Sequence, residues 1–253
     1  MQQADKTALI TGGARRIGRA IALDLAAHGF AVAIHCHGSR AAAEALAGEI
    51  ADGGGRAAVL QADLGDAAAA RGLVPAAADA LGGLGLVVNN ASIFEDDTVH
   101  DFEDAVWQAH FAVHLRAPAE LARALAAALP DGREGLVVNM IDQRVWSLTP
   151  RFFSYTLSKS ALWTATRTMA QALAPRVRVN AIGPGPTLRN ERQSEADFDR
   201  QTEALLLRRG PALAEFGATV RYLWQARSVT GQMIALDGGQ HLAWETPDVR
   251  VAE

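Results

Sequence analysis

The sequence has little cysteine: Cys36 is the only one among 253 residues. A single cysteine excludes an intramolecular disulfide and a metal site built from several cysteines, and it fits a reducing compartment. No basic segment followed by a long apolar run opens the chain, so we expect no signal peptide. No apolar stretch approaches the ~20 residues that a membrane-spanning helix needs. We therefore expect a cytoplasmic protein without a transmembrane segment.

The sequence also lacks a concentrated block of basic residues. It carries 24 Lys and Arg against 28 Asp and Glu, for a formal net charge of -4. This balance argues against nucleic acid or an anionic membrane as a partner. With no linker, internal repeat or metal-ligand cluster evident, we expect one domain over residues 1–253 with an irregular tail from residue 240, and no bound metal.

A glycine-rich turn lies between an apolar strand and an amphipathic helix near the start of the chain. Thr7–Ile10 predicts a buried strand, residues 19–28 predict a helix, and Thr11-Gly-Gly-Ala-Arg-Arg-Ile-Gly18 lies between them. Glycines let a backbone approach a pyrophosphate, and a helix N-terminus offers N–H groups to it. The spacing is not G-x-G-x-x-G, so the turn alone is compatible with a nucleotide site or an ordinary tight turn.

No acidic residue follows the second predicted strand, Ala31–Cys36. An NAD site would place Asp or Glu there for the ribose hydroxyl groups. Hydroxyl and cationic groups, which suit a ribose 2′-phosphate, stand there instead: His35, His37, Ser39 and Arg40, joined by Arg15 of the glycine turn. The segment predicts NADP(H) over NAD(H); the alternative is a solvated loop.

Strands and helices alternate along the rest of the chain. Further strands are predicted at Ala57–Gln61 and at residues 84–88, 136–140, 177–180 and 232–236. Helices are predicted at residues 41–51, 66–81, 101–115, 118–129 and 211–224, and after Tyr155. This alternation predicts an α/β fold, a doubly wound parallel sheet of about seven strands with helices on both faces. Residues 189–207 have the composition of a mobile lid or, equally, of a surface helix pair.

Polar residues fall at the carboxyl ends of several predicted strands, where such sheets bind ligands. Asp63 follows the third strand and suits an adenine amino group, or else caps the next helix. Asn90, Ala91 and Ser92 follow the fourth strand, and Asp142 follows the fifth. Their common position predicts a single site at this edge of the sheet.

Tyr155 and Lys159 are four residues apart and so share one face of a helix. Free tyrosine has a pKa of about 10, and an ammonium group one turn away is expected to lower the pKa of Tyr155 toward neutrality. We expect Asp142, from the end of the strand at residues 136–140, to converge with them at one site. Taken alone, the Tyr-x3-Lys pair is also typical of a solvated helix face.

These segments together resemble the short-chain dehydrogenase/reductase family. The likeness runs from Thr7 to Gly239 and rests on motifs in the family's order: the glycine turn 11–18, Asp63, Asn89-Asn-Ala91, Tyr155-x3-Lys159, Asn180, Pro184-Gly185 and Asp237-Gly-Gly239. Most members have glycine in place of Arg16, serine in place of Asp142 and asparagine in place of His114. These three departures, His35-Cys-His-Gly-Ser39 and the segment 236–242 resemble the pteridine reductase and dihydromonapterin reductase branch.

The resemblance implies a role for each matched residue. It implies that NADPH delivers hydride to a C=N bond, with Asp142, Tyr155 and Lys159 catalytic. A pterin would stack on Phe94, with Arg16, Ser92, Asp142 and Tyr155 also touching the substrate. Arg16, Ser92, Tyr155 and Lys159 are implied to contact the cofactor as well. The remaining residues implied at the cofactor are Gly12, Ile17, Gly18, Leu64, Asn90, Ala91, Met140, Pro184 and Gly185.

Several alternatives stay open from sequence. Asp142 is otherwise a structural carboxylate, and Phe94 a pocket wall; Trp146, Phe152 and Phe153 are further aromatic candidates without a ranking. His114 puts the family's asparagine-linked water chain in doubt. The leading hypothesis is reduction of a dihydropterin or dihydrofolate, within folate metabolism. The alternatives are reduction of another carbonyl or imine, and a catalytically silent NADPH-binding protein. The resemblance also implies a homotetramer.

Overall fold

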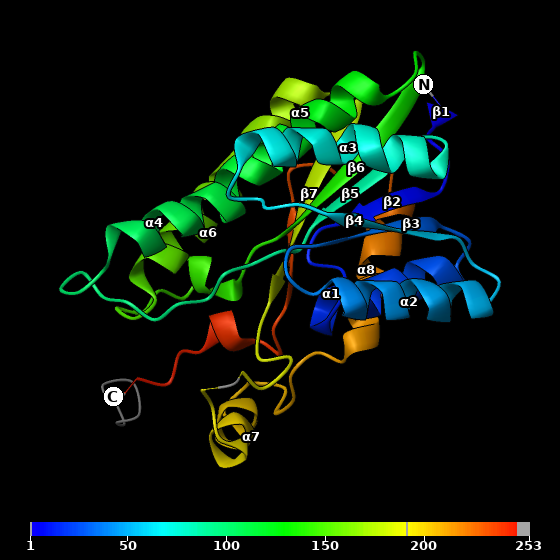
Figure 1. Ribbon diagram of the computed structural model, residues 1–253. Helices are drawn as coiled ribbons and strands as arrows, with labels where there is room; N and C mark the ends of the chain where they lie inside the picture. The colour runs from blue at the N-terminus through cyan, green and yellow to red at the C-terminus, as the bar shows by residue number, and fades with distance from the viewer. Residues whose placement is uncertain (1, 191, 247–253) are drawn as a thin grey trace.

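A parallel sheet runs through the computed structural model, which describes residues 2–190 and 192–246 (Figure 1). Its strands lie in the order β4 (Ala57–Gln61), β3 (Ala31–Cys36), β2 (Thr7–Ile10), β5 (Leu86–Asn89), β6 (Arg133–Met140), β7 (Val177–Pro184) and β8 (Met233–Leu236). A two-residue strand, β1 (Gln2–Gln3), also pairs with β6 in parallel. The strand order reverses direction between β2 and β5, which is where such sheets bind ligands. The predicted α/β doubly wound fold is confirmed.

Helices cover both faces of the sheet and bury two apolar cores. On one face lie α1 (Arg16–Ala27), α2 (Arg40–Asp52) and α8 (Leu213–Gln225); on the other lie α3 (Ala67–Leu81), α5 (Ala117–Ala128) and α6 (Phe153–Leu173). Successive strand residues alternate between the two cores: Ala8 and Ile10 of β2 face the first, and Leu9 faces the second. The sheet is thereby held rigid beneath the ends of its strands.

The two helices predicted at 101–115 and 118–129 form one continuous helical segment, so that prediction was wrong. α4 (Asp104–Phe111) runs into a π-helical turn, η1 (Ala112–Arg116), which runs into α5. Pro118 has no N–H to donate to the carbonyl group four residues earlier. The π turn lies directly before it, and the Ala117 N–H there bonds to Ala112 O, five residues back. The chain thus accommodates the proline without ending the helix.

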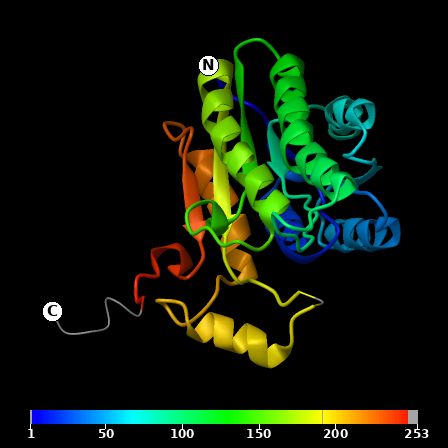
Figure 2. The ribbon, with the colours of Figure 1, turned by 90° about the vertical axis from the view of Figure 1, so that its left-hand side faces the viewer.

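Among the described residues of segment 189–207 there is one helix, α7 (Glu195–Glu203), and not a pair. α7 stands apart from both helical layers, beyond the carboxyl ends of the strands (Figure 2). The tail predicted as irregular begins with a 3-10 turn, η3 (Gln240–Leu242); residues 243–246 are irregular and 247–253 lie outside the described residues. Across 2–190 and 192–246, no helix has the length and apolar character needed to cross a membrane.

Candidate active site

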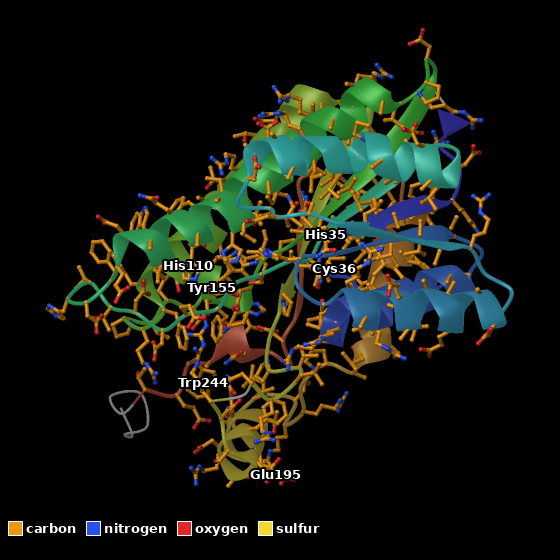
Figure 3. All side chains as sticks on the ribbon, in the orientation of Figure 1. His35, Cys36, His110, Tyr155, Glu195 and Trp244 are labelled. Atoms are coloured by element: carbon orange, nitrogen blue, oxygen red, sulfur yellow. The ribbon has the colours of Figure 1, made fainter. Side chains whose placement is uncertain are left out.

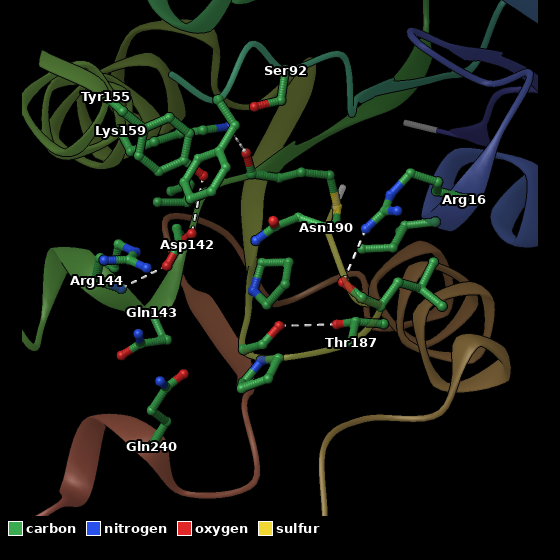
Figure 4. Close-up of a pocket in the computed structure, with 18 of the residues that line it drawn as sticks. Arg16, Ser92, Asp142, Gln143, Arg144, Tyr155, Lys159, Thr187, Asn190 and Gln240 are labelled. Atoms are coloured by element: carbon green, nitrogen blue, oxygen red, sulfur yellow. Dashed lines mark hydrogen bonds between the residues drawn. The ribbon is translucent and has the colours of Figure 1, made fainter. Parts of the chain in front are cut away.

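A cavity of about 510 Å³ lies at the carboxyl ends of β2, β5, β6 and β7 (Figure 4). The segment leading into α7 contributes to its wall. Many residues predicted from sequence line this one cavity: Arg16, Ile17, Asn90, Ser92, Phe94, Met140, Asp142, Tyr155, Lys159, Pro184 and Gly185. The topology therefore brings together groups that are up to 169 positions apart in the chain (16 to 185).

Tyr155 and Lys159 project from the first turns of α6 toward Asp142 at the end of β6. The Tyr155 hydroxyl donates to Asp142 Oδ2 over 3.0 Å, and Lys159 Nζ donates to the Met140 carbonyl over 2.8 Å. Asp142 Oδ1 accepts the Arg144 N–H over 2.9 Å and so caps the 3-10 turn η2 (Gln143–Val145). One carboxylate oxygen of Asp142 thus holds the turn η2, and the other binds the Tyr155 hydroxyl.

The expected lowering of the Tyr155 pKa by Lys159 is wrong for this arrangement. Burial, and then the Asp142 carboxylate, raise the pKa of Tyr155 well above its usual value. Lys159 lies over the phenol ring, with Nζ 5.7 Å from its centroid, and burial lowers the pKa of Lys159 itself to about 8. Burial also raises the pKa of Asp142. Tyr155 therefore keeps its proton near pH 7 and is suited to donate it.

Arg16 occupies the glycine turn in a backbone conformation that normally favours glycine. Its φ is +52°, in the left-handed region, which explains physically why most family members have glycine there. The Arg16 guanidinium donates to the carbonyl groups of Leu188 and Arg189, each over 3.0 Å. These bonds tie the glycine turn to the segment before α7 and help to offset the backbone strain.

Asn90 braces the glycine turn from the neighbouring strand. Its Nδ2 donates to Thr11 O over 2.9 Å and to Gly12 O over 3.0 Å. Gly18 packs against the same atoms: a Cβ there would lie 2.4 Å from Gly12 O and 2.6 Å from Asn90 Nδ2. Gly12, with φ +60°, lies against Ala91. The turn therefore has its shape before any ligand binds.

His35 does not present its ring to a ribose phosphate, so that prediction was wrong. The residue lies on β3 within the fold (Figure 3) and is 2% exposed. Nδ1 accepts the Gly12 N–H and Nε2 bonds to Ala62 O, each over 3.1 Å. Burial lowers the pKa of His35. The ring is thus a neutral bridge that positions the glycine turn.

The other predicted phosphate ligands lie at the surface beyond β3. His37 Nδ1 is 3.5 Å from Asp63 Oδ1, and Arg40 pairs with Glu44 over 2.7 Å. Ser39 precedes α2 and is half-buried. Arg15 is exposed, and its side chain forms no hydrogen bond or ion pair among the described residues. These side chains are free to reorient toward an anion.

Asp63 is not the helix cap that the sequence left open as its alternative role. Its Oδ1 accepts the Gly65 N–H over 2.7 Å and its side chain is 57% exposed. The cap of α3 is Asp66, whose Oδ1 accepts the Ala68 N–H over 2.7 Å. Leu64, between them, is buried in the core.

An aromatic wall closes one side of the cavity. Phe94 stacks on Phe152, with ring centroids 4.3 Å apart and planes at 9°, and meets Tyr155 edge-on at 4.8 Å. The other two aromatic candidates lie elsewhere: Trp146 contacts Trp163 and His241, and Phe153 contacts Phe102 and Trp107. Phe152 is therefore the aromatic partner of Phe94.

Two arginines at the aromatic wall were missed from sequence. Arg144 lies 4.7 Å from the Phe152 centroid and 5.8 Å from that of Phe94. Arg192, from the segment before α7, donates to Phe94 O and pairs with Glu95 over 2.9 Å. Arg144 follows a strand end closely, which is a usable signal; nothing local in the sequence indicates Arg192.

A buried polar cluster at the start of α6 was also missed. Asp97 accepts the Ser154 N–H over 3.1 Å and the Ser154 hydroxyl, while its backbone carbonyl accepts the Phe153 N–H. Ser154 Oγ is 2.7 Å from His110 Nδ1, and burial lowers the pKa of His110. His110 lies beside Tyr155 (Figure 3), with ring centroids 5.9 Å apart. Asp97 thus caps the helix that carries Tyr155.

Replacing Asp97 by alanine is expected to lower the free energy of unfolding by ~1–3 kcal/mol, because buried donors on Ser154 lose their acceptor. Urea denaturation measures this change. The matched control is Asp96→Ala, whose partner Arg151 is exposed at the surface, so a loss below ~1 kcal/mol is expected. Equal losses in the two variants would contradict a capping role for Asp97.

Comparison with known proteins agrees with this geometry. The short chain dehydrogenase family matches residues 6–199. Crystal structures of FolM Alternative dihydrofolate reductase 1, both complexed with NADP, are similar to this chain: that from Brucella canis is 62% identical, with a TM-score of 0.94, over 97% of this chain and 98% of the other. The structure from Brucella suis is 63% identical, with a TM-score of 0.94, over 96% of this chain and 98% of the other. 3-Oxoacyl-[acyl-carrier-protein] reductase FabG of Staphylococcus aureus is 30% identical over 94% of this chain and 98% of its own length. The chain therefore belongs to the short-chain dehydrogenase/reductase family, as the order of its motifs predicted.

Proposed function

We propose that this protein is an NADPH-dependent reductase that reduces a C=N bond of a pterin-type substrate, a dihydropterin or dihydrofolate. The observation that carries the proposal is the Tyr155–Asp142 hydrogen bond of 3.0 Å inside a cavity walled by Phe94. A carboxyl group replaces the family's usual serine there. Identity of 62–63% to the two FolM structures supports the same substrate class.

The residues at the strand ends fit NADP(H). The close packing of Gly18 fixes the shape of the glycine turn, and the turn lies next to the N-terminus of α1, where backbone N–H groups suit a pyrophosphate. His37, Ser39, Arg40 and Arg15 would hold the 2′-phosphate, and Lys159 the nicotinamide ribose. When bound, the cofactor supplies a hydride. The NADP-bound state of both FolM structures supports this assignment.

The chain's own residues supply the proton and hold the substrate. Tyr155, protonated near pH 7, donates its hydroxyl proton to a ring nitrogen. The charged Lys159 stabilises the phenolate that remains. The free lone pairs of Asp142 accept N–H groups of an amino-pyrimidine ring, which a serine hydroxyl does less well. The Phe94 side chain orients a planar ring for reaction.

We expect kcat/KM to fall as the pH rises through about 8, because the pKa of Lys159 is lowered to about 8 by its burial. Below that pH the ammonium carries its charge; above it the neutral amine no longer stabilises a phenolate, so the rate falls up to tenfold per pH unit. NADPH oxidation between pH 6 and 10 measures the profile. Lys159→Met should turn over slowly and lack this decline, and a wild-type profile that stays level through pH 9 would contradict the assignment.

The test of the function is NADPH oxidation followed at 340 nm with dihydrobiopterin, dihydromonapterin and dihydrofolate. We expect turnover by the wild type and a loss of about 100-fold in Asp142→Ser, because without the carboxylate the substrate ring is no longer held in the orientation for reaction. NADPH binding without oxidation by any of the three would overturn the pterin proposal and favour a silent cofactor-binding protein.

A second candidate is reduction of a carbonyl substrate on the same scaffold. The 30% identity to the 3-oxoacyl reductase supports it, whereas the Asp142 carboxylate does not. Faster NADPH oxidation with a 3-oxoacyl thioester than with any dihydropterin, together with full activity in Asp142→Ser, would favour this candidate.

We also propose one catalytic domain per chain, a cytoplasmic location and a homotetramer. Exposed apolar side chains near α4 and α6, Phe102 and Leu157, and near the end of the sheet, Leu242 and Trp244, support association. Light scattering coupled to size exclusion measures the mass of the assembly against the 26.8 kDa chain.

A further inference from the structure

His114 replaces the asparagine that most family members have, and it links two segments of the site. The residue is 1% exposed and lies on the π turn η1. Its Nε2 accepts the Ile93 N–H over 3.1 Å and lies 3.0 Å from Ser92 Oγ. Its Nδ1 lies 2.8 Å from Ser158 Oγ. The imidazole thus joins the loop after β5 to helix α6.

The hydrogen bonds fix the protonation of this ring. A backbone N–H is always a donor, so Nε2, which accepts from Ile93, carries no proton. The ring proton is therefore on Nδ1 and is donated to Ser158 Oγ. The Ser158 hydroxyl in turn donates to the Tyr155 carbonyl over 2.7 Å. The Ile93 N–H, the two ring nitrogens of His114 and the Ser158 hydroxyl all have hydrogen-bond partners only if His114 is neutral.

Ser92 lies between His114 and the reacting end of the site. It lines the cavity together with Tyr155. Burial raises the pKa of Tyr155 most, and the Ser92 hydroxyl, as a donor toward the phenol oxygen, acts on that pKa in the opposite direction. The His114 and Tyr155 rings meet edge-on, with centroids 5.4 Å apart. A serine hydroxyl has one proton and can rotate. It can donate to the His114 lone pair in one orientation and to the Tyr155 oxygen in the other.

We propose that His114 is a positioning residue that holds the Ser92 hydroxyl beside Tyr155, so that Ser92 rotates to donate to the phenolate that forms during turnover. This inference rests on the proposed function. In that step the Tyr155 O–H bond breaks, an N–H bond forms on the substrate, and NADPH is oxidised to NADP+. Ser92 keeps its own proton. His114 loses the Ser92 bond, keeps the Ile93 N–H bond and stores no proton.

The kinetic test is a cycle of single and double variants. Ser92→Ala should lower kcat about 30-fold, the effect of one hydrogen bond to a charged oxygen, with the KM for NADPH unchanged. Ser92→Thr, which keeps a hydroxyl, should restore most of the rate, and Ser160→Ala, a serine outside the cavity lining, should match the wild type. Because His114 acts through Ser92, adding His114→Asn to Ser92→Ala should lower kcat little further. The proposal would be overturned if the kcat losses of Ser92→Ala and His114→Asn multiplied in the double variant, or if Ser92→Ala kept the wild-type kcat.

A second measurement does not depend on turnover. It can therefore fail or succeed independently of the proposal that the substrate is a pterin. In protein labelled with 15N at its seven histidines, we expect two rings protonated at Nδ1 and bare at Nε2. One is His110, because the Ser154 hydroxyl donates to Asp97 and accepts from His110 Nδ1; the other is His114, which should not titrate between pH 5.5 and 8.5. Its Nε2 resonance should shift in Ser92→Ala. His35 should show the opposite tautomer, since its Nδ1 accepts the Gly12 N–H. If no Nδ1-protonated ring responds to Ser92→Ala, His114 does not hold that hydroxyl.

Discussion

Tyr155→Phe is expected to lower kcat about 1,000-fold while NADPH affinity stays within about twofold of the wild type. The substitution removes the hydroxyl that donates to Asp142 and leaves the ring packing against Phe94 and His114 in place. General acid catalysis contributes ~10²–10⁴-fold in enzymes. Single-turnover NADPH oxidation measures the rate, and fluorescence titration measures binding.

The chain provides a matched control, because it has only two tyrosines. Tyr222, in α8, is 53% exposed and is not among the residues that line the cavity. Tyr222→Phe should leave kcat unchanged. If Tyr155→Phe retained a tenth or more of the wild-type rate, the proton would have to come from another group, with Asp142 the nearest candidate.

Gly18→Ala is expected to weaken NADPH binding by at least 100-fold. The added Cβ would lie 2.4 Å from Gly12 O and 3.0 Å from Gly13 Cα, and these are backbone atoms of the turn itself. The turn can relieve the clash only by moving away from the shape that admits a pyrophosphate. Overpacking of this kind also costs ~1–3 kcal/mol of stability. Calorimetric titration with NADPH measures the affinity.

Gly72→Ala is the matched control for this change. Gly72 lies inside α3 with no atom within 4 Å of the added Cβ. There the substitution should raise the free energy of unfolding by ~0.5–1 kcal/mol, because alanine favours a helix, and leave NADPH affinity unaltered. Wild-type affinity in Gly18→Ala would show that the turn does not bind the cofactor through its backbone.

The strands were more predictable than the helix boundaries. Three predicted strands, β2, β3 and β4, match the structure to the residue, because each is a short, mainly apolar run between polar or glycine-rich segments. α1 begins at Arg16, three residues before its predicted start, since Arg16 enters the helix from a positive φ that composition does not reveal. The continuous helix through Pro118 depended on a π turn with no sequence signature.

Site residues were predictable where they directly follow a strand or share one face of a helix. Asp142, Tyr155 and Lys159 meet because one follows β6 and the others share a face of α6. His35 was misassigned although strand alternation held the signal: it shares the face of Ala31 and Ala33, both core residues.

Two other features could not be found in the sequence because they depend on tertiary structure. Arg192 reaches the carbonyl of Phe94, 98 residues away, and no local pattern reports such a pairing. The direction of the Tyr155 pKa shift depends on its burial and on the distance to Asp142, which only the folded chain defines.

The three buried neutral histidines make the stability of the fold depend on pH. Burial lowers the pKa of His35, His110 and His114 in the native state, whereas in the unfolded chain a histidine titrates near 6.5. Below that pH the unfolded chain binds more protons than the native one, so native stability declines as the medium is acidified. Each histidine adds up to about 1.4 kcal/mol per pH unit to that decline. Acid is therefore expected to break first the hydrogen bonds of these histidines, which hold the glycine turn, the start of α6 and the loop that carries Ser92.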